Sequence, residues 1–217
     1  MHITKLGHCC LLIEENGLRI LTDPGIFTVA KHQELRNINV VLFTHEHPDH
    51  YHLGSLKKII ANNPQIVVLS NPSVGALLSG EGIVHTIVAD GQTTEERGVL
   101  IEGYGSVHGV LHLSLPVVQN TGYFIAERLW YPGDSFTDPG KRAKVMALPV
   151  AGPWMKLSEA IDYCAAQKPE LCFPVHDGLL NDTFLSFGSI YKVPAAVLEP
   201  RGIQFSVFEL DKEYSFN

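Results

Sequence analysis

Apolar and polar positions alternate along this chain in short segments, and most of these segments have the period and composition of β-strands. Cys9–Glu14 and Leu18–Thr22 predict two strands that are joined at Asn16-Gly17, a dipeptide typical of tight hairpin turns. Between Val84 and Tyr131, four β-compatible segments (VHTIV, VLIEGYG, GYFIA and LWY) are separated by glycine-rich turns. Other short apolar runs predict buried strands: they are Asn39–Thr44, Ile66–Leu69, Val145–Val150, Leu171–Val175 and Ile203–Leu210.

Three segments have the spacing of amphipathic helices. Leu53–Asn62 carries its apolar residues on one face and is followed by a proline at position 64. Pro72–Leu78 predicts a short helix with Asn71 as its N-cap and the proline in its first turn. Leu157–Gln167 is the clearest helix of the second half of the chain. Because strands outnumber helices and alternate with them, we expect an α+β fold in which helices cover two sheets on their outer faces.

Composition and charge exclude or disfavour several classes of protein. The 217 residues are 45% hydrophobic and 18% charged, which excludes disorder, collagen and coiled coil. Without a repeat, a low-complexity segment or a linker, we expect one domain, 1–217. The net charge of −7, without a basic cluster, disfavours binding to nucleic acid or to an anionic membrane surface.

The same data predict a cytoplasmic protein. The chain opens directly into a strand-like run, without the pattern of a signal peptide, and no apolar stretch approaches the roughly 18 residues that span a bilayer. Its four cysteines show no pairing pattern, as is typical of reduced thiols in the cytosol. Cys9 and Cys10, neighbours on a predicted strand, should point to opposite faces of the sheet as core residues.

The most informative segment follows the strand Asn39–Thr44. It reads His-Glu-His-Pro-Asp-His from residue 45 to residue 50, and four of the 11 histidines lie between residues 45 and 52. His45 and His47 are two residues apart, so in extended backbone they project to the same side and can grip one ion. Asp49 and His50 follow a proline, where the chain turns, and can reach a second ion. Imidazole beside carboxylate suits a divalent metal such as zinc, and the end of a buried strand is a common place for an active site.

This HxHxDH motif is a hallmark of the metallo-β-lactamase superfamily, which the chain resembles over nearly its whole length. The other parts of that family's pattern appear in the same order: they are Asp23 in LTDPG, His108 in GYGSVHGV, Asp134 in WYPGDS and His176 in FPVHDG. The resemblance implies a four-layer αββα sandwich, the metallo-β-lactamase fold. It also implies a dinuclear metal centre in which every ligand position is filled.

Carried over residue by residue, the resemblance assigns the ligands of two metal ions. His45, His47 and His108 would hold the first ion. Asp49, His50 and His176 would hold the second, and Asp134 would bridge the two. Asp23 would buttress the metal-binding loop from behind. Zinc is the expected metal, although such sites also accept manganese and iron.

Some positions leave alternatives open. Ser106–Gly109 replaces the family's usual GHTxG context, so His112 is an alternative to His108 as the third ligand. The opening GHCCLLIE is similar to a branch that includes ascorbate-6-phosphate lactonase-like and N-acylphosphatidylethanolamine phospholipase-like proteins, which would place His8 near the metal centre. The other interpretation of His8 is a core histidine. Two groups of residues are candidates for contact with substrate: the aromatic Phe27, Tyr131, Phe136 and Trp154, and the polar Ser135 and Asp177.

The activity implied by the resemblance is hydrolysis. A hydroxide that bridges the two ions would attack an ester, lactone or phosphodiester of a small molecule, and Asp49 would orient it and could accept its proton. A second hypothesis is a persulfide dioxygenase-like enzyme with a single iron. A third is a nuclease-type phosphodiesterase, which the acidic chain without an RNA-binding arm disfavours. The sequence leaves the substrate and the oligomeric state open.

Overall fold

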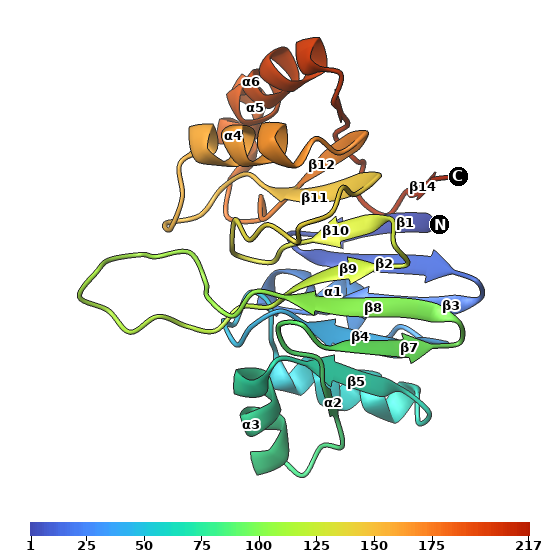
Figure 1. Ribbon diagram of the computed structural model, residues 1–217. Helices are drawn as coiled ribbons and strands as arrows, with labels where there is room; N and C mark the ends of the chain where they lie inside the picture. The colour runs from blue at the N-terminus through green and yellow to red at the C-terminus, as the bar shows by residue number, and fades with distance from the viewer.

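The computed structural model describes residues 1–217 and contains two seven-stranded sheets packed face to face (Figure 1). The strand order of the first sheet is β14-β1-β2-β3-β4-β5-β6, and that of the second is β13-β12-β11-β10-β9-β8-β7. The first sheet contains β1 (His2–Gly7), β2 (Cys10–Glu15), β3 (Leu18–Thr22), β4 (Val40–Phe43), β5 (Val67–Ser70), β6 (Thr86–Ile87) and β14 (Glu213–Ser215). The second contains β7 (Thr93–Glu96), β8 (Val99–Tyr104), β9 (Gly122–Ile125), β10 (Leu129–Tyr131), β11 (Val145–Pro149), β12 (Leu171–Val175) and β13 (Gln204–Phe205).

Six α-helices lie on the outer faces of the two sheets (Figure 1). The helices beside the first sheet are α1 (Val29–His32), α2 (Leu53–Asn62) and α3 (Pro72–Gly80). Those beside the second are α4 (Leu157–Gln167), α5 (Asp182–Phe187) and α6 (Ser189–Leu198). Single 3₁₀ turns occur at Ile26–Thr28 and Glu199–Arg201. None of the helices is both long and apolar enough to cross a membrane.

The burial pattern shows why these elements form four layers. A cluster of 22 buried residues, including Leu11, Tyr123 and Phe173, fills the space between the sheets. Separate clusters lie outside them, such as that of 15 residues against α4 and α6. Cys9 belongs to the cluster between the sheets and Cys10 to an outer one, so the two thiols do point to opposite faces. The expected αββα sandwich is confirmed.

Most predicted elements are present. The bounds of α2, α4, β3 and β12 match the predicted ones, and Asn71 caps α3 by accepting a hydrogen bond from the Val74 N–H. The strand predicted at Ile203–Leu210 was too long, because only Gln204–Phe205 pairs with β12. Beyond it the chain crosses from the second sheet to β14 in the first, and Phe208 stacks on Phe173 on the way, with ring centroids 4.2 Å apart.

Other elements also differ from the predicted ones. The segment VHTIV forms only the two-residue strand β6. The elements that were not predicted are α1, α5, α6, β7 and β14. A sequence signal for α5 does exist, because Asn181 caps it through a hydrogen bond from the Phe184 N–H. The helix α6 contains Pro194, which lowers its helix propensity; it is stabilised by packing against α4 and β13.

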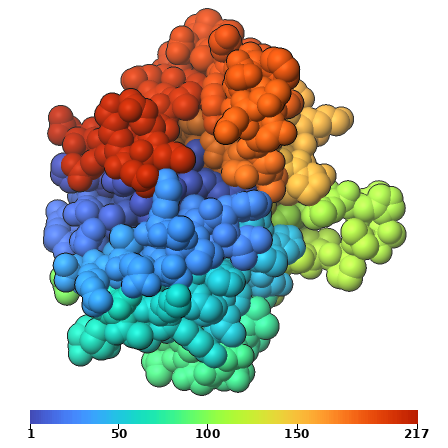
Figure 2. Space-filling view, turned by 180° about the vertical axis from the view of Figure 1, so that it is seen from behind, coloured from blue at the N-terminus to red at the C-terminus, as the bar shows by residue number.

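The long connection between β8 and β9, residues 105–121, projects from the body of the molecule and is visible at its side in both views (Figures 1 and 2). We call it the projecting loop. We call residues 44–52, which follow β4, the histidine loop. The two loops meet where the Thr121 N–H at the end of the projecting loop donates to the Thr44 carbonyl at 3.1 Å. His108 lies at the base of the projecting loop, where its backbone N–H donates to the Val118 carbonyl at 3.0 Å. The candidate ligands therefore gather where strands of both sheets end.

Candidate metal centre

The histidine loop is held in place from behind by Asp23. This carboxylate is fully buried and accepts hydrogen bonds from the Thr44 N–H at 2.8 Å, the Thr44 hydroxyl at 2.7 Å and the His50 Nδ1–H at 2.8 Å. The Tyr131 hydroxyl donates to the same carboxylate at 2.6 Å. Asp23 therefore orients the His50 ring so that its Nε2 faces the other candidate ligands. Asp23 thus lies behind the histidine loop, and its role as a support of the metal ligands stays a prediction.

A close backbone contact explains the glycine in LTDPG. A Cβ atom on Gly25 would lie 1.9 Å from the Asp49 carbonyl oxygen, so no other residue fits there without moving the histidine loop. The Ile26 N–H donates to the Pro48 carbonyl at 2.9 Å, which joins the same two segments. The motif thus contributes both a carboxylate and a close approach of two chain segments.

The first group of candidate ligands is His45, His47 and His108, whose facing nitrogen atoms all lie within 4.8 Å of one another. His45 Nε2 and His47 Nδ1 are 3.1 Å apart, close to the edge of about 3.3 Å that a zinc tetrahedron has when its Zn–N bonds are 2.0–2.1 Å. The His45 Nδ1–H donates to the Thr44 hydroxyl at 3.0 Å, and the His108 Nδ1–H donates to the Gly109 carbonyl at 2.7 Å. These bonds leave Nε2 of both rings free of a proton, as metal ligation requires.

The second group lies on the other side of Asp134. His176 Nε2 is 2.8 Å from Asp134 Oδ2 and 3.4 Å from Asp49 Oδ2. His50 Nε2 is 3.2 Å from Asp134 Oδ1, and His108 Nε2 of the first group is 3.4 Å from Asp134 Oδ2. Asp134 therefore contacts members of both groups, in the position expected of a bridging carboxylate.

Several atoms of these two groups are buried without a hydrogen-bond partner: they are His50 Nε2, His108 Nε2, Asp134 Oδ1, and both ring nitrogens of His176. A buried polar atom without a partner costs on the order of 1–3 kcal/mol, and here several point to the same place. Divalent metal ions would satisfy them, because imidazole nitrogen and carboxylate oxygen are their common ligands. The residues thus fit the metal centre that the sequence predicts, although the assignment of each ligand stays a prediction.

The carboxylates around the two groups of candidate ligands also favour the binding of cations. Burial by itself lowers the pKa of His50, but the Asp134 and Asp23 carboxylates raise this pKa well above its ordinary value. The same competition, with Asp134 and Asp49 as the carboxylates, raises the pKa of His176 to about 9. His45 has no such excess of carboxylates, and burial keeps its pKa well below the ordinary value. Positive charge is therefore stabilised around Asp134.

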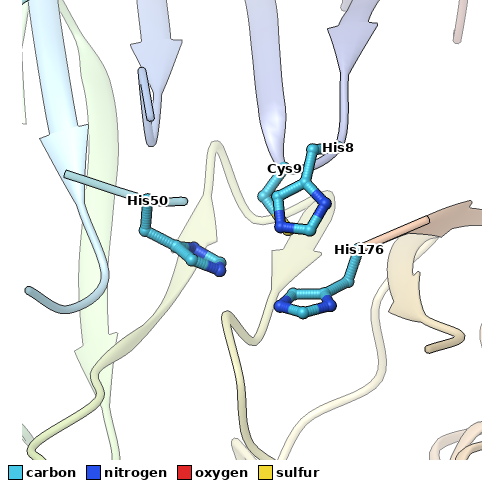
Figure 3. A group of neighbouring side chains, drawn as sticks. All are labelled: His8, Cys9, His50 and His176. Atoms are coloured by element: carbon cyan, nitrogen blue, oxygen red, sulfur yellow. The ribbon is translucent and has the colours of Figure 1, made fainter. Parts of the chain in front are cut away.

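His8 lies beside the second group and contacts Asp49. Figure 3 shows the rings of His8 and His176 next to each other, 4.2 Å apart between centroids, with His50 pointing toward them from the opposite side. Burial lowers the pKa of His8 to about 4, so the ring is neutral. Its Nδ1 accepts from the Gly178 N–H at 3.2 Å, so Nε2 carries the proton and donates to Asp49 Oδ2 at 3.1 Å. Both nitrogens are used, which makes His8 a support for Asp49.

Cys9 lies near the same histidines (Figure 3) but is a poor ligand. Burial, and then the neighbouring carboxylates, raise the pKa of its thiol well above the ordinary value. All four cysteines are buried and free of disulfides. The interpretation of Cys9 and Cys10 as core residues is consistent with this burial.

The structure separates His108 from His112. His108 is 3% exposed and belongs to the first group, whereas His112 is an exposed residue of the projecting loop whose Nδ1 pairs with the Ser114 hydroxyl at 2.8 Å. The geometry therefore favours His108 as the third ligand.

Only part of the predicted substrate-contacting set faces the cleft at this site, a cavity of 330 Å³ that His47, Asp49, His108, Asp134 and His176 help to line. Phe27 and Trp154 line it. Tyr131 does not, because its hydroxyl is buried against Asp23, and Phe136 lines a neighbouring hollow. Asp177 is held in an ion pair with Lys5 at 2.6 Å, and Ser135 is 3% exposed and bonded within its own turn.

Sequence reasoning missed two residues that position Asp134. Asn120 is fully buried, and its Oδ1 accepts a hydrogen bond from the Asp134 N–H at 2.9 Å. The Trp154 indole N–H donates to Asp134 Oδ2, also at 2.9 Å. Trp154 was expected only as a pocket residue, and nothing in the sequence distinguishes Asn120 from other loop asparagines.

Comparisons with known proteins identify the family of the chain. Residues 2–176 match the family described as "Beta-lactamase superfamily domain". The chain is 35% identical to Protein Rv0786c of Mycobacterium tuberculosis over 185 residues, which are 83% of this chain and 85% of that protein. It is 35% identical to a UPF0173 metal-dependent hydrolase of Aeropyrum pernix over 82 residues, 36% of this chain and 33% of that protein.

A solved structure shows the same fold. It is that of Igni18, a metallo hydrolase from the archaeon Ignicoccus hospitalis, and it superposes with a TM-score of 0.75 at 18% identity, covering 100% of this chain and 99% of that one. At this identity the likeness supports the architecture alone. The match over residues 2–176 shows that the chain belongs to the metallo-β-lactamase superfamily.

Proposed function

We propose that the protein is a metal-dependent hydrolase that binds two divalent metal ions, with zinc as the expected metal, on either side of Asp134. The observation that carries this proposal is the convergence of unpartnered, buried histidine nitrogens on Asp134, whose Oδ1 is itself unpartnered, at the floor of a cleft. The Aeropyrum pernix relative is called a metal-dependent hydrolase, which supports the same class. The opening GHCCLLIE favours the lactonase-like and phospholipase-like branch of the superfamily.

In this proposal His45, His47 and His108 hold one ion and Asp49, His50 and His176 hold the other. Ions bound there would supply hydroxide at neutral pH by lowering the pKa of water, and would polarise the bond to be cleaved. The substrate classes are esters, lactones and phosphodiesters of small molecules.

The chain's own residues prepare the site for this chemistry. The imidazoles of His176 and His8, whose Nε2 atoms lie 3.4 and 3.1 Å from Asp49 Oδ2, outweigh the effect of burial and hold the pKa of Asp49 well below its ordinary range. Its carboxylate is therefore ionised and can orient the attacking group. His8 fixes one Asp49 oxygen, Asp23 fixes the His50 ring, and Trp154 and Asn120 fix Asp134. Such preorganisation avoids reorientation of these groups during the reaction.

Two variants test the proposal. His47→Ala removes a candidate ligand from the first group, and His112→Ala removes an exposed imidazole from the projecting loop, outside both groups. We expect about two zinc or manganese ions per chain in the wild type by elemental mass spectrometry. His47→Ala should lose bound metal and at least a hundredfold in turnover while its circular dichroism is unchanged, and His112→Ala should retain both properties.

Other outcomes are equally informative. Unchanged metal content and turnover in His47→Ala would show that the first group is not the metal site. About one iron per chain would instead favour the persulfide dioxygenase-like hypothesis, and oxygen consumption with a persulfide would be measured next.

A further inference from the structure

We infer that the cleft selects carboxylic esters or lactones with an apolar acyl chain over phosphodiesters. This inference rests on the hydrolase function proposed above. The inference concerns the walls of the cleft, and the candidate metal ligands form its floor. Two observations carry it: the apolar side chains that stand exposed around the cleft, and the lack of lysine and arginine in its lining.

The wall of the cleft is apolar. Beyond the candidate ligands and Pro48, its lining consists of Ile26, Phe27, Leu111, Pro153, Trp154 and Leu179. Large apolar side chains usually avoid water, yet Ile26, Phe27 and Leu111 are each 47% exposed and Leu179 is 44% exposed. An exposed apolar patch that surrounds a cleft is typical of a ligand-binding site.

These side chains come from four separate parts of the chain. Ile26 and Phe27 follow β3, Leu111 belongs to the projecting loop, Trp154 follows β11, and Leu179 follows β12. Each segment also contributes to, or lies next to, a candidate ligand or its support, so the tertiary structure brings apolar surface and reactive centre together.

The apolar surface continues beyond the cleft into a second hollow of 340 Å³. The two hollows share His47, His108 and Leu111, and the second is lined by further apolar residues of the projecting loop, among them Val110 and Leu115. Leu111 thus lies at the junction of the two hollows. An acyl chain whose carbonyl lies over the ligands has an apolar surface along which to extend.

Charge disfavours a phosphodiester. Neither hollow contains Lys or Arg, whereas sites for phosphoryl transfer generally add such cations to their metal ions. The hollow on the other side of Phe27 contains Lys5 and Lys31, but Lys5 pairs with Asp177 at 2.6 Å and Lys31 with Asp211 at 2.7 Å. A neutral carbonyl compound needs no such cation.

The first test compares chain length and charge. With metal-loaded protein, we expect kcat/KM for p-nitrophenyl esters to rise from acetate to octanoate by about fourfold for each methylene group that is fully buried. Bis(p-nitrophenyl) phosphate should be hydrolysed at least a hundredfold less efficiently than the octanoate. Equal values for acetate and octanoate, or preference for the phosphodiester, would overturn the inference and leave the hydrolase proposal standing.

A matched pair of variants locates the acyl site. Leu111→Ser changes a side chain that is 47% exposed at the junction of the hollows, and Leu77→Ser changes one that is 46% exposed on α3, outside both. We expect Leu111→Ser to lower the octanoate-to-acetate ratio at least fivefold and Leu77→Ser to leave it unchanged. The same ratio in both variants would contradict the assignment.

A binding measurement separates this inference from the hydrolase proposal. Trp154 lines the cleft, whereas Trp130, the other of the two tryptophans, is 1% exposed and packs among the residues beneath α4. Octanamide should change the tryptophan fluorescence saturably and at much lower concentration than acetamide, and Leu111→Ser should weaken this binding. If no ester, lactone or phosphodiester is hydrolysed but octanamide binds in this way, the hydrolase proposal fails and the apolar site stands. If octanamide and acetamide bind alike, the apolar site fails.

Discussion

The histidine loop and the projecting loop both contribute to the candidate metal centre, but they are built in opposite ways. In the histidine loop, Thr44, His45 and His50 are fully buried, and Asp23 and Asn71 bond to it from neighbouring segments. In the projecting loop, the apolar side chains stand in solvent, and Leu113 is 94% exposed. Backbone hydrogen bonds from His108 to Val118 and from Gly109 to Asp134 hold only its base.

This difference in burial and hydrogen bonding corresponds to two different functions of the loops. A metal centre needs ligands whose orientation is set by buried hydrogen bonds, which the histidine loop supplies. A surface that meets substrate needs access, and in general loops carried by a rigid scaffold provide it. The base of the projecting loop belongs to the first task because it holds His108, and the remainder to the second. Substitutions in the two regions should therefore have different consequences.

The largest effect should follow from Asp23→Asn, which breaks the support of the histidine loop. The amide nitrogen or oxygen must then face donors from Thr44, His50 and Tyr131 that now bond to one carboxylate. We expect a 10- to 100-fold loss of metal affinity and a decrease of about 3 to 5 kcal/mol in the free energy of unfolding. Competition with a chelator and urea denaturation measure the two quantities.

Tyr131→Phe is the matched control for Asp23→Asn. It removes only the hydroxyl that donates to Asp23 and leaves the bonds to Thr44 and His50 in place. A loss of about 1 kcal/mol in stability with little change in metal affinity is expected. If the two variants weakened metal binding equally, the bond between Asp23 and His50 would not be what orients the ligand.

An intermediate effect should follow from Gly109→Ala at the base of the projecting loop. A Cβ atom there would lie 2.1 Å from Trp154 Cε3, so the indole must shift, and we expect its hydrogen bond to Asp134 to break. Overpacking of this kind costs about 1 to 3 kcal/mol, and turnover should fall because Asp134 loses a donor. Thermal unfolding and tryptophan fluorescence report on both effects. Gly80→Ala, where nothing lies within 4 Å of the added atom, should leave the tryptophan fluorescence unchanged and should not lower the stability.

An effect on the pH dependence of stability alone is expected from His32, a buried histidine that lies outside both loops. Its ring is fully buried beside Thr28, without a carboxylate, and burial lowers its pKa to about 4. The unfolded chain therefore binds more protons than the native chain between pH 4 and 6.5, so stability falls as the pH falls through this range. We expect His32 alone to lower the free energy of unfolding by about 2 kcal/mol between about pH 7 and pH 5.

The variant His32→Gln should reduce that loss, because glutamine does not titrate there. Urea denaturation of the metal-free protein at the two pH values gives the difference, since the candidate ligands are the same in both chains. His112→Gln, which changes an exposed histidine, serves as the control. An unchanged pH dependence in His32→Gln would rule out this residue as a source of acid sensitivity.

A comparison of the predicted and observed elements shows which of them the local sequence pattern determines. The helices α2 and α4 have the predicted bounds because each has a regular apolar face and a proline soon after its end. The helices α5 and α6 escaped prediction because α5 has no buried residue and α6 contains Pro194. The strand expected at Ile203–Leu210 is shorter because the chain there passes between sheets, which no local pattern encodes.

The sequence by itself determined the family and the identity of the candidate ligands. The spacing of histidine and aspartate within each motif, and the order of the motifs along the chain, are properties of the sequence alone. Tertiary structure decided what the spacing leaves open. It brings His108 rather than His112 to the buried group, directs the His8 N–H at Asp49, and turns Trp154 toward Asp134. Those choices depend on segments far apart in the chain, whose meeting is decided by packing of the two sheets and not by any local pattern.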